Sequence, residues 1–191
     1  MYCNVAQIFS RYWRAYGGLS SLLRSPYFHL AVFLSLLTGH VWNNEAWWEQ
    51  VISTLPNLLG FTLAGFSMFI GFGDERFRSM LADPDEGEVE QRDQPTIYLA
   101  LCSTFVHFIV VQIVALLYAI VAKALWFHVP CLDSVREYLQ ILRFFAWGFG
   151  YLLFLYALTS ALAATMHVFR IASMYEQFRR FDAKKSEDKS E

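Results

Sequence analysis

The chain has 191 residues, of which 56% are hydrophobic, 18% are aromatic and only 17% are charged, whereas about 25% charged residues is usual in soluble domains. This composition excludes an ordinary soluble domain and indicates an all-α integral membrane protein, and the length leaves no room for a second globular domain of usual size. The formal net charge of -2 hides a strong separation of the basic residues along the sequence.

Residues 1–26 predict a cytoplasmic amphipathic helix that lies on the membrane surface before the first span. Apolar side chains recur at helical spacing on one side of this leader, and Arg11 and Arg14 lie on the other. Such a helix places its arginines near anionic lipid headgroups. Gly17 and Gly18 are expected to break it, and its arginines interrupt any apolar run of the kind that a signal peptide needs.

Four transmembrane helices are predicted in a membrane domain over residues 27–181, with spans at 27–42, 50–73, 96–126 and 142–169. The first span is short against the usual length of about 20 residues, and the third is long enough that it must tilt or project. Residues 83–93 contain six acids in eleven positions and predict a solvated cytoplasmic loop. Residues 182–191 are expected to form a charged, disordered tail.

The basic residues predict the orientation of these spans. If the four helices alternate, twelve of the fifteen Lys and Arg residues lie on one side, and only Lys123, Arg136 and Arg143 lie on the other. The positive-inside rule then places both termini and the acidic loop in the cytoplasm. The tryptophans agree, because five of the six fall near the predicted outer interface: Trp42, Trp47, Trp48, Trp126 and Trp147.

The second predicted span carries a continuous stripe of small and polar side chains. These residues recur at steps of 4, 3, 4, 3 and 4 along the chain: Ser53, Asn57, Gly60, Ala64, Ser67 and Gly71. In lipid, small residues let helix backbones approach closely, so the stripe predicts a side that faces protein. It either packs against another helix or lines a water-filled pore. A second row of small residues in the span at 142–169 adds a further packing face, which favours a homo-oligomer.

The predicted cytoplasmic end of the same span suggests a gate. Gly71 and Gly73 flank Phe72, and glycine lowers local helix stability by about 1 kcal/mol relative to alanine. Phe69 or Phe72 is then a candidate hydrophobic constriction that blocks ions by excluding water. The alternative is that Gly73 only caps the helix while Phe72 meets lipid.

No pattern in the sequence supports an enzyme, a metal site or a bound cofactor. The predicted spans hold no Asp or Glu, and neither a metalloprotease motif nor a phosphate-binding glycine loop is present. The deepest ionisable residue is His107, predicted near the bilayer midplane with Thr104 one turn before it, so that both face the stripe. His107 is either a neutral imidazole that bonds a neighbouring helix or a pore residue.

Five arginines are predicted at the cytoplasmic surface: Arg76, Arg78, Arg170, Arg179 and Arg180. In a symmetric oligomer they would repeat as a basic ring able to hold an anionic or nucleotide ligand. The alternative is ordinary positive-inside charge in contact with lipid phosphates, with neighbouring acids forming salt bridges.

Residues 55–77, LPNLLGFTLAGFSMFIGFGDERF, resemble a segment of small bacterial four-helix membrane proteins. The general layout also resembles the membrane effectors of anti-phage defence systems, such as the Hailong membrane effector. These resemblances imply a bacterial inner-membrane location and an oligomeric channel controlled by a nucleotide-derived signal. The leading hypothesis is a homo-oligomeric ion channel gated from the cytoplasm. The alternatives are an accessory or scaffold subunit bound to another membrane protein, and a membrane enzyme that acts on lipid.

Overall fold

The computed structural model describes residues 2–44, 46–71, 75–82, 96–125 and 136–187, and every regular element in these ranges is an α-helix. The helices follow in the order α1 (Tyr2–Tyr16), α2 (Gly18–Arg24), α3 (Pro26–Leu37), α4 (Gly39–Trp42), α5 (Trp47–Gly71), α6 (Glu75–Ala82), α7 (Ile97–Ala124) and α8 (Arg136–Glu187). The all-helical prediction is therefore confirmed for the described residues.

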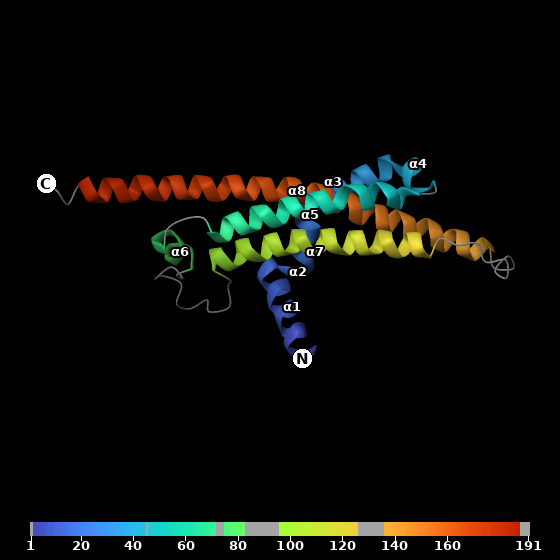
Figure 1. The fold of residues 1–191 in the computed structure, drawn as a ribbon, viewed down its shortest axis with the longest axis horizontal. Helices are drawn as coiled ribbons and strands as arrows, with labels where there is room; N and C mark the ends of the chain where they lie inside the picture. Colours follow the sequence, from blue (N-terminus) through green and yellow to red (C-terminus); the bar gives the residue numbers. More distant parts are fainter. Residues whose placement is uncertain (1, 45, 72–74, 83–95, 126–135, 188–191) are drawn as a thin grey trace.

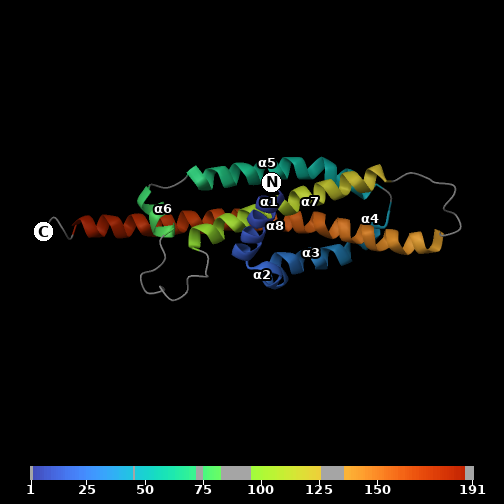
Figure 2. The ribbon, with the colours of Figure 1, turned by 90° about the horizontal axis from the view of Figure 1, so that it is seen from below.

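The long helices α5, α7 and α8 run alongside one another and form the body of the molecule (Figure 1). Seen from below, α5 lies at one edge and α3 at the other, with α7 and α8 between them (Figure 2). Helix α1 leaves this bundle at a steep angle (Figure 1). Three helices are long and apolar enough to cross a membrane, which is compatible with a membrane protein: α5, α7 and the part of α8 within residues 140–184.

Three of the four predicted spans are long helices, whereas the first predicted span is interrupted. Helix α3 has 12 residues and ends at Leu37, which corresponds to about 18 Å of helix, and α4 adds four residues beyond the break at Thr38. The Thr38 hydroxyl donates to the Leu34 carbonyl at 2.7 Å. Such local bonds compete with helix continuation, and the glycine that follows lowers helix stability further. The structure thus has three long helices and one short apolar segment.

Other boundaries differ less from the predicted ones. Helix α5 begins at Trp47 rather than near residue 50, and α7 matches its predicted span within two residues at each end. Helix α8 has 52 residues and continues to Glu187, so residues 182–187 are helical rather than disordered. Near this end of α8, Arg180 pairs with Glu176 at 2.6 Å across one helical turn, a spacing that stabilises helices. The predicted acidic loop at 83–93 lies outside the described residues.

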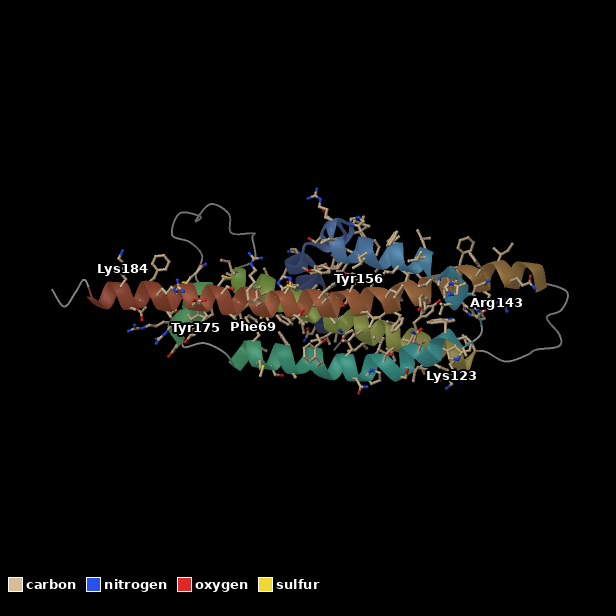
Figure 3. The ribbon with its side chains drawn as sticks, turned by 90° about the horizontal axis from the view of Figure 1, so that it is seen from above. Phe69, Lys123, Arg143, Tyr156, Tyr175 and Lys184 are labelled. Atoms are coloured by element: carbon tan, nitrogen blue, oxygen red, sulfur yellow. The ribbon has the colours of Figure 1, made fainter. Side chains whose placement is uncertain are left out.

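The core divides into two clusters along the bundle. One is rich in tryptophan, with Trp42, Trp47, Trp48 and Trp147 all less than 10% exposed. The other gathers phenylalanines of α5, α6 and α7 around α8. Lys123 and Arg143 lie toward the tryptophan end, and Tyr175 and Lys184 lie toward the opposite end (Figure 3). These four tryptophans thus meet at one end, where their rings fill the core of the chain, and Trp126 lies outside the described residues.

A glycine makes the tryptophan cluster possible. A Cβ atom added to Gly150 would lie 2.5 Å from Trp47 Cη2 and 2.5 Å from Tyr118 Cε1, which is closer than non-bonded atoms approach. We expect Gly150→Ala to lower the free energy of unfolding by about 1–3 kcal/mol, as overpacking does. Gly65→Ala is the matched control, because nothing lies within 4 Å of a Cβ at Gly65. Thermal unfolding in detergent measures both, and equal midpoints for the two variants would contradict this packing.

Candidate functional site

The stripe on α5 points away from the rest of the chain. All six of its residues are exposed: Ser53, Asn57, Gly60, Ala64, Ser67 and Gly71. Val51 and Phe69 are buried on the same helix, and each is nine residues from Gly60, which is about half a turn around a helix at 3.6 residues per turn. A Cβ at Gly60 or Gly71 would meet nothing within 4 Å. The chain therefore packs α5 through the opposite side and leaves the stripe uncovered.

This uncovered face has a polar centre and bulky apolar borders. Ser53 and Ser67 donate their hydroxyls to Gln50 and Leu63 carbonyls of the same helix at 3.1 and 2.9 Å, and the Asn57 amide is exposed. Phe61 and Met68 border the stripe with 60% and 75% of their surface exposed. A polar row on a helix that crosses lipid is unfavourable unless it meets protein or water. The face therefore has the chemistry of a contact or a pore lining.

Of the two aromatic residues predicted as a gate, Phe69 is among the described residues. Phe69 is 7% exposed, and its ring lies 5.7 Å from Phe105 and 5.7 Å from Tyr98, both in α7. In the single chain it therefore packs in the core between α5 and α7. Phe72 and Gly73 lie outside the described residues.

His107 is the centre of a cluster that joins the leader to the bundle. Its Nδ1 lies 2.8 Å from the hydroxyl of Tyr12 in α1, and its Nε2 lies 2.8 Å from the hydroxyl of Tyr156 in α8. The Tyr16 ring stacks on the imidazole at 3.8 Å between centroids and 17° between planes. A neutral imidazole has one donor and one acceptor nitrogen, so one hydroxyl donates to the ring and the other accepts from it. We call Tyr12, Tyr16, His107 and Tyr156 the tyrosine–histidine cluster.

The tyrosine–histidine cluster holds α1 by uncharged contacts. Burial, with a smaller contribution from neighbouring Tyr16, raises the pKa of Tyr12 to about 12. Burial also raises the pKa of Tyr16, and a hydrogen bond with Tyr156 offsets part of that rise. Both phenols of α1 therefore stay protonated at neutral pH and can act as hydrogen-bond donors. The sequence analysis assigned no role to Tyr12, Tyr16 or Tyr156. The only available signal was that the first two lie one helical turn apart on the apolar side of the leader.

The depth of His107 in a membrane follows from its distance to the tryptophan end of the bundle, once a boundary is assumed there. Lys123 pairs with Glu49 at 2.8 Å near the tryptophan end. His107 lies sixteen residues from Lys123 along α7, which is about 24 Å. If that ion pair marks one boundary of a hydrocarbon core about 30 Å thick, His107 lies nearer to the opposite boundary than to the middle.

Thr104 and His107 do not face the α5 stripe. Thr104 donates its hydroxyl to the Ala100 carbonyl at 2.8 Å and lines a cavity beside the leader. A buried polar contact between α7 and α5 is made by Gln112 instead, whose Nε2 donates to the Thr62 hydroxyl at 3.0 Å. That bond lies on the buried side of α5, opposite the stripe.

The predicted arginines are spread over α6 and α8. Arg76 lies 3.7 Å from Asp182, and Arg180 bonds Glu176 at 2.6 Å, all with exposed side chains. Arg170 and Arg179 are also exposed, and the side chain of Arg78 is outside the described part. The single chain therefore pairs two of these arginines with acids of α8.

Within the described residues, no group of three or more His, Cys, Asp or Glu side chains could hold a metal ion. Comparison of the chain with protein-family models, with curated proteins and with solved structures returned no match.

Proposed function

We propose that the protein is a homo-oligomeric ion channel of a bacterial inner membrane, with the α5 stripe facing the symmetry axis. In this proposal the short segment of α3 and α4 crosses the membrane together with the three long helices, so that both termini lie in the cytoplasm. The observation that carries this proposal is the exposure of all six stripe residues on a helix that is long and apolar enough to cross a membrane. The bundle of the single chain covers only the other side of α5.

Further copies of the chain can cover this face. The small side chains of Gly60 and Ala64 allow close approach of neighbouring helices, and the exposed side chains of Phe61 and Met68 supply apolar surface between copies. Closed symmetry repeats the same contact around an axis. The Ser and Asn side chains then line the axis and replace part of the hydration shell of a passing ion.

Gating from the cytoplasmic side remains part of the proposal. Because Phe69 packs against α7, Phe72 beside Gly73 is the better candidate for a constriction at the inner mouth. The exposed side chains of Arg170 and Arg179, together with Arg76 after exchange of its acidic partner, are candidates to hold an anionic ligand. An anti-phage role with a nucleotide-derived signal is what the layout resemblance implies.

The same exposed face also fits an accessory or scaffold subunit that binds a different membrane protein. The mass of the purified protein in detergent, followed by conductance in planar bilayers, separates the two functions. A multiple of the single-chain mass together with discrete currents supports the channel, whereas stable co-purification of an unrelated chain without currents supports the scaffold. Lipid turnover by the pure protein would instead support a membrane enzyme.

A further inference from the structure

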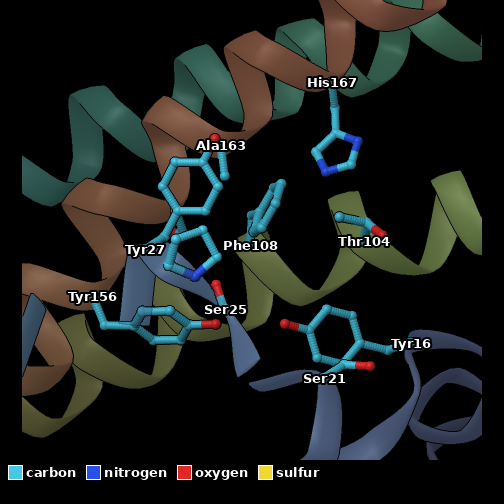
Figure 4. Close-up of a pocket in the computed structure, with 11 residues that line it drawn as sticks. Tyr16, Ser21, Ser25, Tyr27, Thr104, Phe108, Tyr156, Ala163 and His167 are labelled. Atoms are coloured by element: carbon cyan, nitrogen blue, oxygen red, sulfur yellow. The ribbon is translucent and has the colours of Figure 1, made fainter. Parts of the chain in front are cut away.

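A cavity of about 230 Å³ lies where the leader meets the bundle. Its walls come from α1, α2, the start of α3, α7 and α8, and the hydroxyls of Tyr16 and Tyr156 point into the same space (Figure 4). No Lys, Arg, Asp or Glu is among the residues that line it. Six hydroxyl groups of the lining can bond a ligand, and they belong to Tyr16, Ser21, Ser25, Thr104, Tyr156 and Ser160.

These groups offer both hydrogen-bond donors and acceptors. Thr104 and Ser160 donate to the Ala100 and Ala157 carbonyls of their own helices at 2.8 Å each, so they present only lone pairs to the cavity. Ser25 precedes α3 without a capping hydrogen bond from its side chain, which leaves its hydroxyl able to donate. In the described part of the chain, the buried Nδ1 atom of His167 has no hydrogen-bond partner, and His167 lines the same cavity.

A lining of this kind fits an uncharged polyhydroxy group. Each hydroxyl of a diol both donates and accepts, which matches the mixed lining, and the rings of Tyr27 and Phe108 offer faces to its carbon atoms. An ionic group placed inside the cavity would be buried without an opposite charge, which is costly. The cavity therefore selects a neutral part of a ligand.

The positive charge of α8 that follows the cavity lining most closely in sequence belongs to Arg170. Arg170 is exposed and interacts electrostatically with His167. It lies three residues after His167 in α8, and residues three apart share one face of a helix. A phosphate joined to the diol could contact this guanidinium while the diol fills the cavity.

We propose that this cavity binds a glycerophospho group, with the diol inside and the phosphate at Arg170. The group can come from the headgroup of phosphatidylglycerol or from a soluble polyol phosphate. Because the leader supplies one wall and the bundle supplies the other, a ligand bound here stabilises the docked leader by mass action. The binding itself does not depend on conduction.

The test uses the full-length protein in phosphatidylcholine nanodiscs and follows the thermal unfolding midpoint. Glycerol 3-phosphate is titrated in one arm, and phosphatidylglycerol is added to the bilayer in the other. Phosphatidic acid, which carries phosphate without the diol, is the reference lipid. The pocket variant is Thr104→Val with Ser160→Ala, which removes two acceptors and changes little volume. The control variant is Thr165→Val with Ser173→Ala, because these two hydroxyls make the same kind of bond to their own helix outside the cavity.

A rise of the midpoint with either glycerophospho probe supports the proposal, and the arm that responds identifies the source. The half-saturating concentration is expected to increase about tenfold or more in the pocket variant, from the loss of two hydrogen bonds, and to stay unchanged in the control variant. No rise with either probe, an equal rise with phosphatidic acid, or equal affinities of the two variants would overturn it. Conductance of the wild type in phosphatidylcholine alone would then show that the channel proposal stands without this site.

Discussion

Gly60→Leu and Ala64→Leu are each expected to convert the oligomer into single folded chains. In the single chain both residues are exposed, and nothing lies within 4 Å of a Cβ at Gly60, so a larger side chain meets no atom of its own bundle. Between copies it would hold the backbones apart. Overpacking of a close contact costs about 1–3 kcal/mol, which weakens each contact by about 5-fold to 150-fold.

Leu63→Ala is the control for these two variants. Leu63 lies on the same exposed side of α5 but beside the stripe, with 44% of its surface exposed, and its truncation leaves the close approach possible. Size-exclusion chromatography with light scattering measures the assembled mass, and the thermal unfolding midpoint checks the fold. If all three variants assemble like the wild type, the α5 stripe is not an interface between copies.

His107→Leu is expected to release the leader from the bundle. The change removes the hydrogen bonds of the Tyr12 and Tyr156 hydroxyls to the imidazole at 2.8 Å, and a hydrogen bond within a protein contributes about 0.5–1.5 kcal/mol. The leader contacts α7 mainly around the tyrosine–histidine cluster. The change therefore weakens the packing of α1 on α7. Hydrogen exchange of the α1 amides should accelerate about tenfold or more, because 1.4 kcal/mol corresponds to a factor of ten.

His107→Gln and His40→Leu are the matched controls for this prediction. Glutamine retains one donor and one acceptor group, so it should restore part of the protection of α1. His40 is exposed near the tryptophan end, and its replacement should leave α1 unchanged. Unaltered exchange of α1 in His107→Leu would show that the tyrosine–histidine cluster does not hold the leader.

Local sequence patterns predicted those helices whose length and ends are determined by residues within or next to the helix. The long apolar runs of α5 and α7 predicted helices close to the observed ones. The glycine pair after α1 predicted the break, and Gly17 and Gly18 have φ values of 96° and 64°, in the region that glycine tolerates best. The first span was misjudged because its average hydrophobicity says nothing about the interruption at Thr38.

Contacts between distant residues could not be predicted in the same way. Tyr12 and His107 are 95 positions apart, and neither sequence neighbourhood specifies the other. The depth of His107 was inferred from a count within one helix, whereas its environment depends on where α1 and α8 cross α7. The stripe on α5 was found because its period is local. Its exposure could be known only once the opposite side of the helix was seen to carry the packing.

The most direct test of the channel proposal is thiol accessibility along α5 during conduction. In a background without native cysteines, Asn57→Cys, Ser67→Cys and Met68→Cys are compared in planar bilayers before and after a charged, membrane-impermeant thiol reagent. Ser67 and Met68 are adjacent and both exposed in the single chain. A difference in the modification of cysteines at these two positions therefore reports which side of α5 faces water. The proposal predicts that current through the Asn57→Cys and Ser67→Cys channels falls on modification, while Met68→Cys is unaffected. An assembled protein without current, or equal modification of Ser67→Cys and Met68→Cys, would contradict it.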